Sequence, residues 1–600
     1  MNTRNRNPLR NLVCFFSFCT RLFFAKTHDE FANLKREYLD GLFLAKPHLA
    51  TYMGDHRFDD RLPDVSPQGR VLRRRMLEQQ KLRLNALEEA HLPTDEKIDA
   101  HVLSQGIDLE LLYLDEIKEW EWEPRLYDSF PYYDPREIIA TRILNILHGD
   151  FSPLEERVRH ATLQMQQLPE FLNQVKSQLK NPVRLNTEQA ILDNQGRLRV
   201  FEGEVEEFIR TTDGLSPTLR SEAELARKTA VAALEDYQRF LEKDALPRST
   251  QEWRLGAEHF KRKFVLALQT DLAPEDIIPR AELSLRQWQL ELLEVSRQLY
   301  LELFPGKAMP QPDRTATLES KLVAAIQNEL AKDHPEAQDF VDAHRRILSE
   351  VRAFVEQENF LALPPADTLR VTIMPPFKQG VAAAEYLSPG LLEHDVPWKA
   401  VYYVDPINPG GDPASIESYL REYNNYDIGL TGMHEAYPGH HTQAYFSKQF
   451  LNPLRVVLWN SPYTEGWAIY ATNLVTSHGY GGKRNLRYSF FNLKSQLRMA
   501  LNTLIDIELH SHQMTEQEAV HRMMEDGFQE QAAAERKLLR AQLETTQLSQ
   551  YYVGFEEIQR LADAVKAARG DQFDQKEFNE TLLKHGPIPV KDLRMYFHLN

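Results

Sequence analysis

Residues 221–247, SEAELARKTAVAALEDYQRFLEKDALP, carry the pattern that decides the fold class. Apolar side chains recur there at the three- and four-residue spacing of an amphipathic helix: Ala230, Leu234, Tyr237 and Leu241. Ser221 and Glu224 form a capping-box pattern at the start, and Pro247 ends the run. The stretch therefore predicts a helix with one buried face.

The same amphipathic helical pattern extends over most of the chain. Amphipathic stretches broken by Pro and Gly run from about residue 31 to residue 354, and helical periodicity resumes near residue 415. Between them, residues 368–374 (TLRVTIM) and 399–404 (KAVYYV) are β-branched and aromatic runs flanked by prolines, which is typical of short strands. We therefore expect a small sheet in an otherwise helical protein.

These patterns predict a mainly α protein with two large lobes. We expect a helical N-terminal lobe over residues 26–362 and a C-terminal catalytic lobe over residues 363–600, which carries the small β-sheet beside the active-site helix. With 600 residues, 42% of them hydrophobic and 26% charged, the chain is able to bury large cores. It contains no internal repeat and no low-complexity segment.

Charge and cysteine content exclude several classes of function. The formal net charge of -17 argues against binding nucleic acid or an anionic lipid surface, because both need clustered Lys and Arg. The two cysteines, Cys14 and Cys19, lie in an apolar stretch at the N-terminus. No disulfide framework, cysteine-ligated metal or cysteine nucleophile is therefore expected in the main fold.

The first 25 residues leave the location of the protein open. Arg4, Arg6 and Arg10 precede a short apolar run, as in a secretory signal, but Arg21 interrupts the pattern. The segment is either a signal peptide, which would direct the protein to the periplasm or the medium, or the result of a misplaced start or a disordered tail in a cytoplasmic protein. No later stretch approaches the roughly 18 apolar residues that span a bilayer, so no stable membrane span is expected.

The candidate chemistry begins at residues 434–441, HEAYPGHH. In the common HExxH zinc motif, two histidines one helical turn apart bind the ion and the intervening Glu activates water. Here Pro438 occupies the place of the second histidine. On a straight helix, His440 would point about 120° away from His434, and His441 would lie about 10 Å further along the axis.

Pro438 and Gly439 supply a way to bring a second histidine back. Proline removes an N–H and clashes with the carbonyl four residues earlier, while glycine tolerates backbone angles closed to other residues. If these two residues loop out, His440 regains an effective one-turn spacing from His434. This favours His440 over His441 as the second metal ligand. The alternative is a kinked helix whose histidines are merely hydrogen-bonded at the surface.

A third ligand is expected downstream. Ser461 and Pro462 suggest a helix N-cap and first helical residue, and Glu465 follows in the first turn. Glu465 comes 25 residues after His440, enough chain for a second helix to return beside the first. Standing alone, such a glutamate would be explained by the helix dipole. Next to Gly466, which permits close helix approach, and after the histidine motif, it is predicted to bind the metal.

These motifs resemble those of a bacterial family labelled domain of unknown function 885, whose members are similar to zinc metallopeptidases with a glutamate ligand. The family's H-E-x-x-P-G-H-H motif corresponds to HEAYPGHH, followed by Thr442-Gln443, and its E-G-W-A motif corresponds to residues 465–468. The resemblance is motif-specific from about residue 431 to residue 593. It implies a metallopeptidase-like fold, one Zn²⁺ ion and His440 as the ligand from the doublet.

Two further family patterns match this chain, with some departures. D-x-x-x-H corresponds to Asp506 and His510, and Q-x-x-x-Y to Gln547 and Tyr551. The chain departs from the family at Thr545-Thr546 (usually Pro-Gly), Asn502 (usually Arg) and Asn579 (usually His). These departures affect loops and substrate contacts more than the metal ligands. Asp506 and His510 share a helix face and are expected to pair, and Tyr551 would ordinarily be a packing residue.

The predicted function is zinc-dependent hydrolysis of peptide bonds, with short peptides as substrates. His434, His440 and Glu465 would bind zinc, Glu435 would act as general base, and His510 or Tyr551 would stabilise the oxyanion. A strand near residues 402–405 would hold an extended peptide by main-chain pairing. The alternatives are a zinc hydrolase of another amide or ester and a noncatalytic helical binding protein. Oligomeric state does not follow from these residues.

Overall fold

The computed structural model describes residues 8–88, 91–128, 136–312, 317–375, 379, 383–393 and 397–599, with side chains from residue 27 onward. Of the N-terminal segment 1–25, residues 1–7 lie outside the described residues, and the backbone from Pro8 belongs to the first helix. The choice between a signal peptide and a tail therefore stays a prediction. Within the described part of the chain, no helix combines the length and the apolar composition needed to cross a bilayer.

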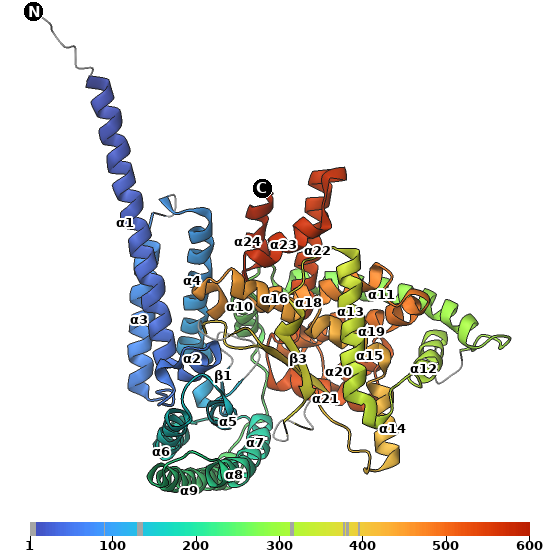
Figure 1. Cartoon of the computed structure of the whole chain (residues 1–600), viewed down its shortest axis with the longest axis horizontal. Helices are drawn as coiled ribbons and strands as arrows, with labels where there is room; N and C mark the ends of the chain where they lie inside the picture. The colour runs from blue at the N-terminus through green and yellow to red at the C-terminus, as the bar shows by residue number, and fades with distance from the viewer. Residues whose placement is uncertain are drawn as a thin grey trace, which may run out of the picture.

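The first helices stand together at one side of the molecule, and α1 projects well beyond its body (Figure 1). They are α1 (Pro8–Ala45), α2 (Pro47–Met53), α3 (Pro67–Asn85) and α4 (Thr94–Leu112). Prolines occupy the first position of α2 and α3, where the missing N–H has no helical partner to lose. The body-facing end of α1 buries Phe31, Leu34, Tyr38 and Leu42.

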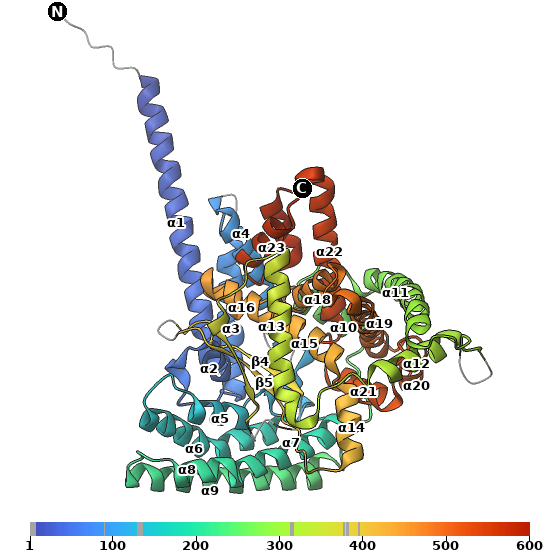
Figure 2. The same ribbon diagram turned by 45° about the vertical axis from the view of Figure 1, so that its right-hand side comes forward.

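The next helices form a layer at one end of the molecule, which Figure 2 shows below the rest. They are α5 (Ala140–His148), α6 (Leu154–Gln178), α7 (Arg184–Glu202), α8 (Glu204–Thr211) and α9 (Pro217–Phe240), preceded by the antiparallel pair β1 (Tyr127–Asp128) and β2 (Arg136–Glu137). In α9 the predicted stripe is buried: Ala230, Leu234 and Tyr237 are 0% exposed. The helical interpretation of residues 221–247 is thus confirmed.

The predicted start of that helix is wrong. Helix α9 begins at Pro217 with Ser216 as its N-cap, because proline is pre-organised for the first helical position. Ser221 lies inside the helix, where its hydroxyl donates to the Pro217 carbonyl. Glu224 accepts hydrogen bonds from Arg227 instead of closing a capping box. A one-turn π segment, Leu241–Ala245, extends the helix before the chain reaches Pro247.

Four helices and a sheet follow. The helices are α10 (Ala257–Leu268), α11 (Pro274–Leu303), α12 (Leu318–Leu330) and α13 (Phe340–Glu358), and the strands are β3 (Leu369–Ile373), β4 (Ala384–Leu387) and β5 (Ala400–Val404). The two predicted strands are confirmed as β3 and β5, which pair in parallel, while β4 pairs with the other side of β5 in antiparallel fashion. The strand order is β3-β5-β4, and α13 packs beside β3.

The rest of the chain is helical. It comprises α14 (Pro413–Glu422), α15 (Asn425–Glu435), α16 (His440–Gln449), α17 (Pro453–Val457), α18 (Ser461–Ser477), α19 (Asn485–His510), α20 (Glu516–Glu525), α21 (Gln531–Leu543), α22 (Ser549–Arg569), α23 (Gln575–Lys584) and α24 (Val590–Leu593). The most extensive packing joins α18 to α22 and α19 to α11. Helix α15 packs against α13, α18 and α19. The helix that carries His434 therefore lies in the centre of this part of the chain.

Buried apolar side chains form two clusters. One consists of Leu62 and residues between 126 and 245; the other combines residues 31–117 with residues 260–597. The protein is mainly helical with a small three-stranded sheet, as expected from the sequence. The predicted boundary between two lobes at residue 362 stays a prediction. The two buried clusters instead separate residues between 126 and 245 from the rest of the chain.

Candidate metal centre

The predicted bend is present between α15 and α16. Helix α15 ends at Glu435, the Tyr437-Pro438 peptide bond is cis, and α16 starts at His440. Gly439 is required for the close approach at this turn, because a Cβ atom there would come within 1.8 Å of the His434 carbonyl oxygen. Pro438 and Gly439 therefore separate two helices and allow His440 to lie beside His434.

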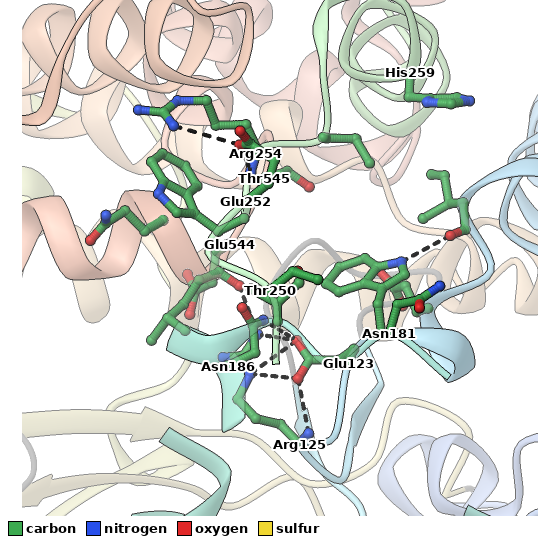
Figure 3. A pocket seen from close by; sticks show the side chains of 18 of the residues that line it. Glu123, Arg125, Asn181, Asn186, Thr250, Glu252, Arg254, His259, Glu544 and Thr545 are labelled. Atoms are coloured by element: carbon green, nitrogen blue, oxygen red, sulfur yellow. Dashed lines mark hydrogen bonds and ion pairs between the residues drawn. The ribbon is translucent and has the colours of Figure 1, made fainter. Parts of the chain in front are cut away.

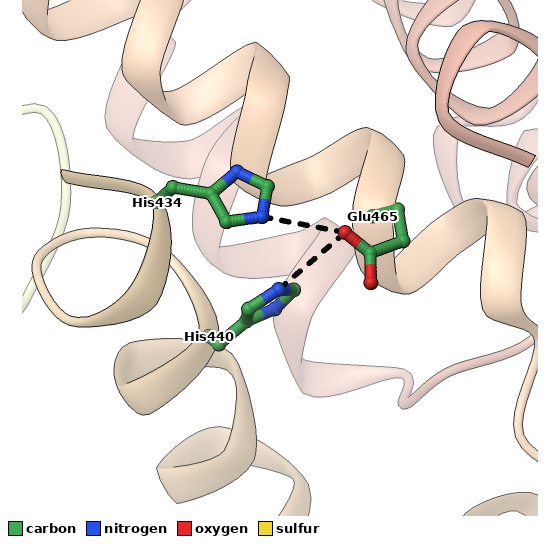
Figure 4. Close-up of side chains that lie close together, drawn as sticks. All are labelled: His434, His440 and Glu465. Atoms are coloured by element: carbon green, nitrogen blue, oxygen red, sulfur yellow. Dashed lines mark ion pairs between the residues drawn. The ribbon is translucent and has the colours of Figure 1, made fainter. Parts of the chain in front are cut away.

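Three side chains from three helices meet at this bend (Figure 4). The Nε2 atoms of His434 and His440 lie 3.3 Å and 3.6 Å from Oε2 of Glu465, respectively. The two imidazole rings are 4.7 Å apart, centre to centre, and nearly perpendicular. One nitrogen or oxygen atom from each side chain lies within 4.8 Å of the others, an arrangement that no other three His, Cys, Asp or Glu side chains share within the described residues.

The donor set fits a zinc ion. Tetrahedral zinc with bonds of about 2.0–2.1 Å to His nitrogen and carboxylate oxygen places neighbouring ligand atoms about 3.3 Å apart. The two measured nitrogen–oxygen separations, 3.3 Å and 3.6 Å, are close to that value. Two imidazoles and one carboxylate also leave a fourth position open, as catalytic zinc sites require. The three residues are thus compatible with a bound ion.

Glu465 interacts favourably with both histidines through its charge. Burial would lower the pKa of His440, but the negative charge of Glu465, with that of Glu435 nearby, raises this pKa to about 9. Burial would likewise raise the pKa of Glu465, yet His440 and His434 hold it well below its usual range. The carboxylate is therefore ionised at neutral pH, as a metal ligand must be.

Helix α18 holds Glu465 in place and also fastens the bend. Its N-cap is Asn460, whose side chain accepts from the Tyr463 N–H at 2.7 Å, so the predicted N-cap at Ser461 is wrong by one residue. An Asn side chain reaches the first-turn N–H groups as well as a Ser side chain does. Two residues after Glu465, the fully buried Trp467 donates from Nε1 to the Pro438 carbonyl at 3.0 Å. Sequence reasoning missed this contact.

His441 has a different role from His440. Its side chain is fully buried, and Nε2 lies 3.1 Å from the Thr368 hydroxyl, just before β3. Its ring stands edge-on to Tyr386 and Tyr437. Burial, reinforced by the charge of Arg352, lowers the pKa of His441 to about 3, so the ring is neutral. This geometry favours His440, not His441, as the ligand from the doublet.

Glu435 lies next to His434 and lines a cavity of about 810 Å³. One face of α15 forms a wall of this cavity along its length, through Asp427, Leu430, Thr431 and His434. Helices α12, α14, α19 and α21 contribute further wall residues, as do Ile469 and Thr472 on α18 and the segment 527–530. A carboxylate beside a candidate metal ligand thus faces space for another molecule.

The structure does not bring His510 to this cluster. His510 is fully buried, its Nε2 donates to the Ala541 carbonyl at 2.9 Å, and its ring stacks on Phe260. It also stands edge-on to Trp253, which lines a separate cavity of about 310 Å³. The polar side chains of that second cavity bind one another: Arg125 and Asn186 both donate to Glu123 (Figure 3). The oxyanion role therefore finds no support at His510.

The expected pairing of Asp506 with His510 is also wrong. Asp506 accepts hydrogen bonds from the Thr546 and Ser549 N–H groups, both at 3.1 Å, and from the Ser549 hydroxyl at 2.6 Å. These donors stand at the start of α22, whose free N–H groups compete successfully for a buried carboxylate. Asp506 therefore joins α19 to α22.

Tyr551 lies in the first turn of α22 and is partly buried. The Gln547 side chain approaches its hydroxyl at 3.5 Å, so the two members of the Q-x-x-x-Y pattern do meet. Helix α22 crosses α18 one turn further on, at Gly554 and Gly466. Of the two proposed oxyanion donors, His510 and Tyr551, only Tyr551 thus stays a candidate.

The strand expected to hold a peptide is already occupied on both sides. Strand β5 is the central strand, so Tyr402 pairs with Val371 on β3 and with Tyr386 on β4. The Asp405 N–H, just beyond the strand, donates to the Ala383 carbonyl at 2.9 Å. Main-chain pairing of a peptide with residues 402–405 is therefore excluded. The expectation was wrong because the short strand β4 was not predicted from the sequence.

Fold and site together define a mainly helical protein that gathers two histidines and one glutamate from three helices. The chain belongs to the family described as "Bacterial protein of unknown function (DUF885)", whose model matches residues 47–595. This match confirms the family resemblance inferred from the motifs. Among curated proteins, none matches the chain.

Solved structures that are similar to this chain include two bacterial proteins. The first is a "putative lipoprotein of unknown function" from Shewanella oneidensis, with 27% sequence identity, a TM-score of 0.80, and coverage of 94% of this chain and 99% of that one. The second is a "putative lipoprotein" from Colwellia psychrerythraea, with 17% identity, a TM-score of 0.76, and coverage of 95% and 99%, respectively. The second likeness concerns the fold alone.

Proposed function

We propose that this protein is a zinc-dependent peptidase that binds the ion through His434, His440 and Glu465. The observation that carries the proposal is the convergence of these side chains, with nitrogen–oxygen distances of 3.3 Å and 3.6 Å, next to a glutamate that faces a cavity. A purely structural zinc site is usually closed by four protein ligands, whereas catalytic sites combine three with an open position. The donor set therefore supports catalysis over a structural role.

Glu435 is the proposed general base. Zinc, when bound, would supply Lewis-acid chemistry, which lowers the pKa of water and polarises a carbonyl group. The Glu435 carboxylate would take a proton from the attacking water and pass it to the leaving amine. His434 and Glu435 are neighbours on α15 and both line the cavity, so the proton acceptor would stand beside the activated water.

A short peptide is the proposed substrate. The cavity of about 810 Å³ lies in the range of pockets that enclose small molecules, about 300–1,000 Å³. It is too small for a folded protein but large enough for several residues of an extended chain. The competing functions are hydrolysis of another amide or ester at the same centre and noncatalytic binding by the helical shell.

Metal analysis and a peptide digest test the proposal together. We expect about one zinc ion per purified chain and cleavage of peptides from a synthetic library, with products identified by mass. Glu435→Gln should reduce kcat by about 10²–10⁴-fold and leave zinc bound, because it removes the base but no ligand. The matched control is Glu358→Gln, which changes an exposed glutamate at the end of α13 and should leave turnover unchanged.

The outcomes separate the three functions. Zinc binding with hydrolysis of esters or other amides, but of no peptide, would identify the rival hydrolase. A protein that binds zinc and hydrolyses none of these compounds would be a binding protein. Full activity of Glu435→Gln, or loss of its metal, would contradict the role given to Glu435.

We also propose that the protein works in the cell envelope or outside the cell. The two similar structures carry the description of lipoproteins, and residues 1–25 contain a basic segment followed by an apolar run. Cell fractionation with an antibody against the folded body measures this directly. Recovery in the cytoplasm alone would rule the location out.

A further inference from the structure

A group of positive charges lines the cavity away from the metal centre. Lys494 and Arg498 lie one turn apart on α19, and Arg536 on α21 faces the same space. Lys537 is the next residue on α21; burial, and then the charges of Arg540 and Arg498, lower its pKa to about 7. Together these four residues form the cationic cluster discussed below.

The cluster is electrostatically unfavourable as it stands. Like charges four residues apart on a helix repel each other. Among the described residues, no carboxylate comes within ion-pair distance of any of the four. Lys494 donates to the side-chain oxygen of Gln327, which is uncharged. Burial, and then the charge of Arg498, lower the pKa of Lys494 to about 7. An anion bound between α19 and α21 would relieve this repulsion.

Acidic residues in the same cavity do not neutralise the cluster. Glu530 raises the pKa of Lys494, but only from beyond ion-pair distance and less than burial and Arg498 lower it. Asp427 is partly buried, and this burial raises its pKa to about 6 although the charge of Arg498 lowers it. Glu422 is exposed at the end of α14. The cationic cluster thus keeps a net positive charge, to which an anionic group of a ligand can bind.

The spacing of residues along α15 gives the distance between the cationic cluster and the proposed metal centre. Arg498 acts on Asp427, and Asp427 precedes His434 by seven residues on the same helix. At about 1.5 Å per residue, this is a separation of about 10 Å along the cavity wall. An extended peptide advances about 3.3–3.6 Å per residue, so two or three residues bridge the two places.

We propose that the cationic cluster binds the C-terminal carboxylate of a short peptide whose scissile bond lies at the metal centre. Guanidinium and ammonium groups are the side chains that recognise carboxylates best, and Arg can do so through two parallel hydrogen bonds. The protein would then remove fragments of two or three residues from the C-terminal end of its substrates. This inference rests on the proposed peptidase function and specifies its substrate class.

Paired peptides test the inference. Each peptide in an acetylated hexapeptide set is made twice, once with a free C-terminal carboxylate and once with a C-terminal amide. We expect the zinc-loaded protein to cleave the free acids at a kcat/KM about 10- to 100-fold higher than the amides, the size expected for a lost charge-assisted hydrogen bond. The released fragments should be dipeptides or tripeptides from the C-terminal end.

Variants assign the effect to the cluster. Arg498→Gln should raise KM for free acids about 10- to 100-fold and change the cleavage of amides little. Lys494→Gln provides a second variant with the same expected direction. The matched control is Arg286→Gln, which makes the same substitution at an exposed arginine of α11 outside the cavity and should leave both peptides unaffected.

A binding measurement keeps the inference separate from the peptidase proposal. In zinc-loaded Glu435→Gln protein, polarisation of N-terminally labelled peptides should show tighter binding of the free acid, and Arg498→Gln in that background should abolish the difference. If binding discriminates but nothing is cleaved, the carboxylate site stands and the peptidase proposal fails. Equal cleavage and equal binding of the pair would overturn the inference and leave the peptidase standing. Rescue of the amides by an acidic side chain near their C-terminus would also overturn it, in favour of acidic peptides.

Discussion

Trp467 contacts the bend between His434 and His440, two of the three proposed metal ligands. Its Nε1 donates to the Pro438 carbonyl at 3.0 Å, between a fully buried indole and a buried proline. The contact joins α18, which carries Glu465, to the turn that orients His434 and His440. Trp467 is therefore a positioning residue.

Trp467→Phe should weaken zinc binding about 10-fold or more. The change removes the donor and leaves a buried carbonyl unsatisfied, which costs about 1–3 kcal/mol, and outer contacts of this kind typically change metal affinity about 10- to 100-fold. Zinc affinity by competition with a chelating dye measures the effect. The matched control is Trp288→Phe on α11, where the indole packs on Tyr552; it should lower stability without changing the zinc Kd. Equal zinc affinity in wild type and Trp467→Phe would contradict the positioning role.

The residues of the metal centre differ in how far sequence could predict them. His434, His440 and Glu465 follow from motifs whose geometry depends on local backbone rules, chiefly the effect of Pro438 and Gly439. Trp467, Arg498 and Arg536 depend on which helices pack together, and no local pattern encodes that. The like-charged pair Lys494 and Arg498, four residues apart, is a signal in the sequence that could have drawn attention to this helix face, but the sequence analysis did not use it.

At the scale of elements, the crossing of α18 and α22 sets where Glu465 lies. Gly554 on α22 meets α18 so closely that a Cβ atom there would come within 1.7 Å of the Pro462 carbonyl oxygen. Gly466 faces it across the interface, where a Cβ atom would lie 2.2 Å from the Gly554 carbonyl carbon. The glycine next to the predicted ligand is therefore needed for helix approach, as the sequence suggested.

Gly554→Ala should destabilise the protein by about 1–3 kcal/mol, because the added methyl group must push α22 away from α18. Zinc affinity should fall with it, since Glu465 moves with α18. The same change at Gly196 on α7 is the control: a Cβ atom there meets only the Arg199 guanidinium at 3.8 Å. Gly196→Ala should stabilise by about 0.5–1 kcal/mol through helix propensity. Thermal unfolding measures both changes in stability. Stabilisation by Gly554→Ala would show that α18 and α22 have room for a methyl group where they cross, and would contradict the close contact.

The elements themselves were predictable to the extent that their patterns are local. Amphipathic helices and the two strands with flanking prolines were found from residue spacing. Strand β4 was not, because its four residues, AEYL, carry too little pattern to stand out. Missing one edge strand made β5 look available for a peptide when it is the centre of the sheet.

For the whole molecule, the arrangement of cores could not be predicted from the sequence. Helices α1, α3 and α4 share a buried cluster with helices after residue 260, while α5–α9 enclose their own. Contacts between such distant segments, for example Arg455 with Asp99 at 2.7 Å, depend on tertiary packing alone. Three histidines lie deep in the larger of these packed parts, His344 at 2% exposure and His441 and His510 at 0%.

These three histidines make stability depend on pH. Burial lowers the pKa of His344, of His441 and of His510 to about 3, from an ordinary value of about 6.5 in the unfolded chain. At these three positions the unfolded chain therefore binds more protons than the folded protein below about pH 6.5. Stability is fully present above that pH and is lost as the pH falls toward 3.

The free energy of unfolding should thus fall by about 1.4 kcal/mol per pH unit for each buried histidine once the pH is below about 6. Urea unfolding between about pH 7 and about pH 5, with zinc removed so that the ligand histidines bind no metal in either state, measures the slope. His344→Phe removes one titrating group from the core and should reduce the slope by that amount, whereas His521→Gln changes an exposed histidine on α20 and should not. A slope that His344→Phe leaves intact would mean that His344 takes up a proton without unfolding, so the packing around it opens more readily than its 2% exposure implies.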